Sequence, residues 1–85
     1  MPYIKQERRN YYDPHLFKAV DGIVFKGDLT YCLYKLCSLY MNSIDTNYEN
    51  LSMVMSCLED AKLEWYRQRM APYEDMKIKE NGGIE

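Results

Sequence analysis

The sequence has few of the residues from which catalytic and metal sites are usually built. Its 85 residues include one histidine, His15, and three cysteines, Cys32, Cys37 and Cys57, with no CxxC pair. A Ser/His/Asp or Cys/His set cannot be assembled with any specificity around one histidine, and its spacing to the cysteines fits no common zinc site. We therefore expect no catalytic residue, no metal and no cofactor. An odd number of cysteines without such a pair predicts reduced, mostly buried thiols in a cytosolic protein.

Three further absences narrow the class of protein. No apolar run approaches the roughly 18 residues needed to span a bilayer, and the first ten residues, MPYIKQERRN, lack the apolar core of a signal peptide. The net charge of -2 argues against general nucleic-acid binding, which needs a strongly basic face. The glycines are scattered or terminal, so there is no Gly-rich phosphate loop. The sequence therefore predicts a non-enzymatic, cytoplasmic protein without a membrane span.

The length of the chain favours self-association. A domain of this size buries only about 60% of the surface of its unfolded chain. The stability that remains after conformational entropy is small, and short chains often increase it by oligomerising. We expect a homo-oligomer.

Turn and cap signals divide the chain into an N-terminal basic arm (1–12), a helical domain (13–80) and a flexible C-terminal tail (81–85). Asp13-Pro14 predicts the first helix start, with an acceptor at the N-cap and proline at the first helical position. An apolar stripe follows, formed by Leu16, Ala19, Val20 and Ile23.

Gly27-Asp28 predicts the end of the first helix and the start of the second, with Asp28 as its N-cap. The second helix has the clearest apolar stripe in the chain, formed by Leu29, Cys32, Leu33, Leu36, Leu39 and Tyr40. The polar residues 42–47 predict a loop. Asn50 then predicts the cap of a third, longest helix, with an apolar stripe formed by Leu51, Val54, Met55, Leu58, Ala61 and Trp65. On this stripe Trp65 can lie in the core, with Tyr66 on its rim.

Pro72 predicts the end of this third helix or a kink in it. Residues 70–71 should bend towards extended backbone before the proline, and a short helix, 73–80, should follow and stop at Asn81-Gly82-Gly83. No alternating β pattern of useful length is present. The predicted fold is all-α: a small bundle of three main helices plus a short C-terminal helix, in an oligomer.

The last third of the chain concentrates aromatic and cationic residues around Pro72. Lys62, Tyr66 and Arg69 are spaced i, i+4, i+7, so on an α-helix they share one exposed stripe that suits a phosphate or a stacked base. The alternative is a solvated helix face with ordinary i, i+4 contacts. The predicted ligand-binding residues are Arg8, Arg9, Tyr31, Lys62, Tyr66, Arg67, Arg69, Tyr73 and Lys77.

Two of these predictions have structural alternatives. Tyr31 is one of several tyrosines that would equally cover the edge of a small core. Arg8 and Arg9 make the N-terminal arm basic, and Glu74 and Asp75 make the C-terminal segment acidic. Pairing of the two ends, within one chain or between subunits, would account for both charges without a ligand.

Three segments resemble a known family. They are PYIKQERR (2–9), LTY (29–31) and LEDAKLEWYRQRMAPYEDMKIKENG (58–82). The pattern is similar to that of small uncharacterised proteins of phages, prophages and some archaea, with PYI near the start, LNY in the middle and LE..K.E.YRR...PYED.KI.ENGD at the end. The resemblance covers nearly the whole chain. This chain departs from the pattern at Thr30, Gln68 and Gly83, and the Thr30 change would alter any ligand contact made there.

The resemblance implies a virus-associated protein in the host cytoplasm and no enzymatic activity. By analogy with other small phage proteins, we expect a non-catalytic accessory protein that binds and sequesters a small anionic ligand, such as a nucleotide-derived immune signal. The alternative is a protein–protein interaction module that inhibits or adapts a host protein through its Trp/Tyr/Arg-rich C-terminal segment.

Overall fold

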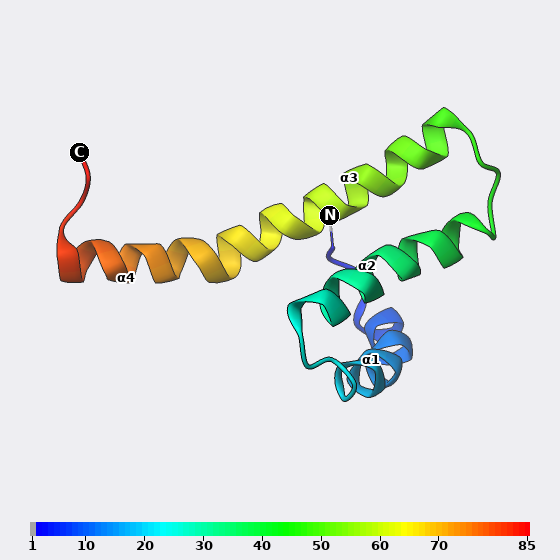
Figure 1. The fold of residues 1–85 in the computed structure, drawn as a ribbon, viewed down its shortest axis with the longest axis horizontal. Helices are drawn as coiled ribbons and strands as arrows, with labels where there is room; N and C mark the ends of the chain where they lie inside the picture. The colour runs from blue at the N-terminus through cyan, green and yellow to red at the C-terminus, as the bar shows by residue number, and fades with distance from the viewer. Residues whose placement is uncertain (1) are drawn as a thin grey trace. The chain divides into compact units, whose positions relative to one another are not determined.

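The computed structural model describes residues 2–85, and within them the chain is helical, without strands (Figure 1). The elements are α1 (Gln6–Val20), α2 (Lys26–Met41), α3 (Tyr48–Trp65), a π-helical turn η1 (Tyr66–Met70) and α4 (Ala71–Asn81). The all-α class is confirmed. The last three elements follow one another without a break as a helix of 34 residues, so the predicted short fourth helix is not separate.

The described chain divides into two units, which we treat separately. One comprises residues 3–54, and the other comprises residue 2 with residues 55–85. Residue 1 of the predicted basic arm lies outside the described residues. Among residues 2–85, no helix is both long enough and apolar enough to cross a membrane.

Helix α1 begins eight residues before the predicted first helical residue, Pro14, at Gln6. The backbone amides of Arg8 and Arg9 donate to the Lys5 carbonyl at 3.0 and 3.1 Å, which closes the first turn. Gln6 Nε2 donates to Asn10 Oδ1 at 2.8 Å, one turn further on. Pro14 therefore lies inside α1, because i, i+4 interactions support the helix before it.

Helix α2 also begins earlier than predicted, at Lys26. Asp28 is not the N-cap: it is the third residue of the helix, and its carboxylate accepts hydrogen bonds from the backbone amides of Val24 and Phe25, each at 3.0 Å. Hydrogen bonding from Phe25, then from Val24, lowers the pKa of Asp28 below its ordinary value. Phe25 has no side-chain acceptor, so only the carboxylate half of a capping box is present.

The loop predicted at residues 42–47 is confirmed, but the cap of α3 is Asn47 and not Asn50. Asn47 Oδ1 accepts a hydrogen bond from the Asn50 amide at 2.8 Å, which satisfies one of the free N–H groups at the helix start. The Asn50 side chain donates in turn to the Asp45 carbonyl at 2.8 Å and holds the loop against the first turn.

The helix does not end at Pro72, and the extended backbone predicted before it is not found. Met70 (φ -76°, ψ -47°) and Ala71 (φ -60°, ψ -46°) are helical, and the Ala71 amide donates to the Tyr66 carbonyl five residues back. In a regular α-helix a proline ring clashes with the carbonyl four residues earlier, here that of Gln68. The wider π turn relieves this clash and the helix continues. It stops as predicted at Gly82, where φ is 84°.

None of the described side chains is buried. Within residues 3–54 no two helices are in close backbone contact, so the predicted bundle packing is not found inside that unit. Trp65, predicted to lie in a core, is 60% exposed. The prediction of mostly buried thiols is also wrong, because Cys32 and Cys37 are half-buried and Cys57 is exposed. The apolar stripes are present, but the chain does not cover them.

Candidate functional site

The most distinctive surface is a row of alternating rings and cations on the long C-terminal helix. Its members are spaced four residues apart: Trp65, Arg69, Tyr73 and Lys77, which we call the aromatic–cation row. The Arg69 guanidinium lies 5.4 Å from the centroid of the Trp65 ring, and the Lys77 ammonium 5.6 Å from that of Tyr73. Both rings are more than half exposed. The row therefore offers stacking surfaces and positive charge together.

The cationic side chains of this unit differ in whether a carboxylate already pairs with them. The Arg67 guanidinium forms a fork on Glu64, with Nη2–Oε1 2.7 Å and Nε–Oε2 3.3 Å. Lys62 lies 3.8 Å from a Glu59 oxygen, and Lys77 3.2 Å from one of Glu80. Arg69 has no carboxylate within ion-pair distance among residues 2–85. Among the cations compared here, the Arg69 guanidinium is therefore best able to bind an anion.

The π turn changes which residues share a face. The pKa of Tyr66 is raised above its ordinary value by hydrogen bonding to the Glu74 carboxylate, then by the charge of that group, with smaller contributions from burial and Asp75. In an unbroken α-helix, residues seven apart are nearly aligned; one extra residue in the turn makes the aligned separation eight. The π turn therefore accounts for Glu74 as the neighbour of Tyr66, whereas Lys62 pairs with Glu59 and Arg69 with Trp65 at ordinary helical spacings.

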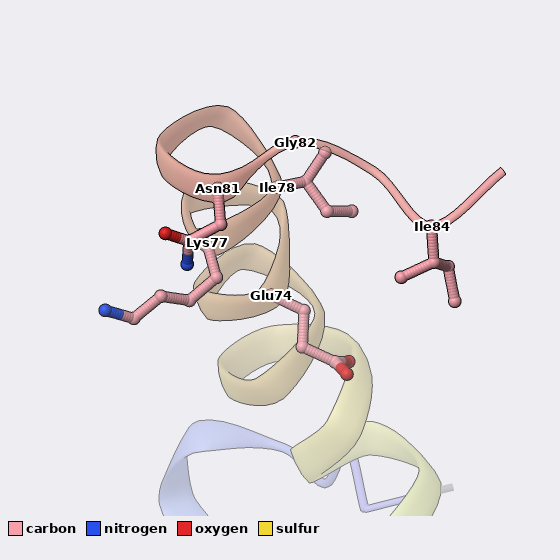
Figure 2. Close-up of a pocket in the computed structure, with 6 residues that line it drawn as sticks. All are labelled: Glu74, Lys77, Ile78, Asn81, Gly82 and Ile84. Atoms are coloured by element: carbon pink, nitrogen blue, oxygen red, sulfur yellow. The ribbon is translucent and has the colours of Figure 1, made fainter.

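Two open depressions flank this surface. One, of about 250 Å³, adjoins the aromatic–cation row and is lined by Pro2, Ala61, Glu64, Trp65, Gln68 and Arg69. Its Glu64 side chain is only 18% exposed; it also accepts a hydrogen bond from Gln68 Nε2 at 3.0 Å. The second depression, of about 340 Å³, lies at the end of α4 (Figure 2). Figure 2 shows Lys77 and Asn81 on one side of the helix and Ile78 on the other.

The other predicted site residues lie in the unit formed by residues 3–54. Arg8 donates to the Tyr12 hydroxyl at 3.2 Å and lies 6.0 Å from the centroid of that ring, in an open depression of about 430 Å³ lined by Glu7, Arg8, Tyr11 and Tyr12. Arg9 Nε donates to the Ile4 carbonyl at 2.7 Å. Tyr31 is 62% exposed on α2.

The match to a family model extends over residues 1–84, and the model is described as a domain of unknown function, DUF6899. The chain belongs to the DUF6899 family. No curated protein and no solved structure was found to match it significantly.

Sequence reasoning missed three aromatic residues of this DUF6899 chain. Trp65 was assigned to a core, although it carries Arg69 on its exposed ring. Tyr11 and Tyr12 form an edge-to-face pair with ring centroids 5.1 Å apart, beside Arg8. The i, i+4 spacing of Arg8 and Tyr12 would have indicated this contact if the first helix had been predicted to begin at Gln6.

Proposed function

We propose that this DUF6899 chain is a non-catalytic binding protein that holds an anionic, ring-containing small molecule of the nucleotide class on the aromatic–cation row. The observation that carries the proposal is the position of the Arg69 guanidinium 5.4 Å from the centroid of the exposed Trp65 ring, with no carboxylate of residues 2–85 paired to it. The cation–π contact holds the guanidinium near the ring, and its N–H groups stay available to two oxygens of a phosphate.

Each member of the row has a part in this binding. The ring of Trp65 or of Tyr73 stacks on the base, since every base presents a π face. Arg69 holds the phosphate, and Lys77 adds a weaker attraction because it is shared with Glu80. The chain holds the molecule without converting it, which sequesters it. The resemblance to phage and prophage proteins makes nucleotide-derived immune signals of a host cell the first ligands to screen.

The test compares two arginine variants that remove the same charge. Wild type is incubated with a panel of linear and cyclic mono- and dinucleotides, and bound mass and affinity are read by native mass spectrometry and calorimetry. Arg69→Ala should weaken binding by about 1–3 kcal/mol, the range for a lost charge-assisted hydrogen bond. Arg67→Ala should change it little, because Glu64 already holds Arg67. If both variants lost the same binding free energy, the aromatic–cation row would not be the binding site.

A second candidate function is favoured by the exposure of the same side chains. Trp65 and Tyr73 project from the outside of a helix at 60% and 53% exposure, as anchors do in helix-in-groove recognition. The chain would then inhibit or adapt a host protein. Affinity capture followed by mass spectrometry distinguishes the two: one host protein, recovered with wild type and lost with Trp65→Ala, supports the second function. Tyr48→Ala, at the 86% exposed start of α3, is the control.

A further inference from the structure

The aromatic–cation row carries two exposed rings on one side of the C-terminal helix. Trp65 and Tyr73 are eight residues apart, and on a regular α-helix such positions are rotated about 80° from one another around the axis. The π turn of residues 66–70 lies wholly between them, and its extra residue cancels most of this rotation. The interaction of Tyr66 with Glu74, one position further along the chain, occurs at the same separation of eight. The two rings therefore lie along nearly the same line of the helix.

Arg69 lies midway between the two rings in the sequence. It is four residues from each, which is about 6 Å along the helix axis. Its guanidinium lies 5.4 Å from the centroid of the Trp65 ring, and no carboxylate of residues 2–85 is within ion-pair distance of it. The order along the helix is therefore ring, cation, ring. This matches the order base, phosphate, base in a molecule whose two bases are joined through phosphate.

The row ends shortly after the second ring. Lys77, its last member, lies 5.6 Å from the centroid of the Tyr73 ring and 3.2 Å from a Glu80 oxygen. The positions four residues beyond the row on either side are Ala61 and Asn81, which offer neither a ring nor a charge. A longer single strand needs further stacking surfaces along its path. The row therefore fits a ligand of two bases better than a nucleic acid.

We infer that the aromatic–cation row takes a ligand with two bases joined through phosphate, with one base on Trp65, the other on Tyr73 and the joining phosphate on Arg69. Two positions about 12 Å apart along the helix do not match bases stacked about 3.4 Å apart, so the ligand binds with its bases separated. This inference rests on the proposed function and narrows its ligand class from nucleotides in general to dinucleotides.

The test measures, by calorimetry on the full chain, the affinities for adenosine monophosphate and for linear diadenylate with a single phosphate. The monophosphate carries at least as much negative charge as this diadenylate, so tighter binding of the diadenylate reports its second base. From the usual contribution of a stacked base, wild type should bind the diadenylate roughly 10- to 100-fold more tightly. Tyr73→Ala should remove most of this difference and change the affinity for the monophosphate little, because Trp65 and Arg69 remain.

Tyr48→Ala is the matched control, because it removes the same side chain at the 86% exposed start of α3 and should keep the difference in affinity. Cyclic diadenylate, measured in parallel, distinguishes a closed ligand from an open one. If neither diadenylate bound wild type more tightly than the monophosphate, or if Tyr73→Ala weakened all three by the same factor, this inference would be wrong and the proposed function would stand. If wild type bound none of the three, both would be wrong.

Discussion

The Tyr66 hydroxyl and the Glu74 carboxylate interact across eight positions of sequence because the π turn between them contains one residue more than an α turn. Side chains on a regular helix meet at separations of three, four and seven. The π turn therefore determines which charged group Tyr66 faces.

Tyr66 should ionise at a higher pH than an ordinary tyrosine, whose value is 10.0. Because the folded chain holds the Tyr66 proton more tightly, this contact contributes stability at pH below about 10 and loses it as pH rises through the folded-state pKa. The measurement is a spectrophotometric titration of tyrosinate, with Tyr66→Phe identifying the Tyr66 component. Glu74→Gln should return that component towards the ordinary value.

Asp75→Asn is the charge-matched control for this titration, because Asp75 makes only the smallest contribution to the pKa of Tyr66. A Glu74→Gln chain in which the Tyr66 component does not move would show that the two residues are not coupled.

Pro72→Ala should remove the reason for the π turn. With an amide N–H restored and the ring gone, the segment can close into a regular α-helix, which should raise stability by about 1–3 kcal/mol and increase helix content. The change of register should also separate Tyr66 from Glu74 and lower the pKa of Tyr66. Thermal melts by circular dichroism and the tyrosinate titration measure these effects.

Pro14→Ala provides the matched control, because Pro14 lies inside α1. It should change stability without moving the Tyr66 titration. If Pro72→Ala left that titration unchanged, the proline would not be what sustains the turn.

Asp28→Ala should shorten α2 and lower the melting temperature at neutral pH, because two backbone amides lose their acceptor. The pKa of Asp28 is lowered in the folded chain, so its stabilisation is present above the unfolded-state value, 3.8, and is lost as pH falls through the folded-state value. Wild type should therefore lose stability in acid below about pH 4 more steeply than the variant. Asp21→Ala, which removes the same charge at the end of α1 and none of the hydrogen bonds to Val24 and Phe25, is the control.

Asn47→Ala should destabilise α3 by about 1 kcal/mol, the usual loss for an N-cap. Asn50→Ala should cost less, since it removes only the bond to the Asp45 carbonyl. Chemical denaturation of the two variants at one protein concentration gives the comparison. Equal losses would mean that Asn47 does not act as the cap.

The sequence predicted where the chain is helical more accurately than where each helix begins. The loop at residues 42–47 and the stop at Gly82 were correct, because polar runs and a glycine with positive φ interrupt helices for local reasons. The caps of α2 and α3 were each assigned to the third helical residue, Asp28 and Asn50. Capping boxes place hydrogen-bonding residues at both the N-cap and the third position, so the pattern does not distinguish them.

The candidate site was predicted from the sequence less accurately than the helices were. Pro72 indicates that the α-helix is disturbed, but whether the helix breaks or widens depends on backbone hydrogen bonds formed by the residues around it. Trp65 was assigned to a core because it continues an apolar stripe. Periodicity identifies the apolar face of a helix and does not identify what covers it.

The absence of any buried side chain among the described residues has a consequence for calorimetry. The heat capacity change on unfolding and the steepness of denaturant transitions both scale with the surface newly exposed. A single helical chain with so little surface to expose should melt broadly, with a small heat capacity increment. A sharp transition with a normal increment would therefore report the dissociation and unfolding of an assembly in one step.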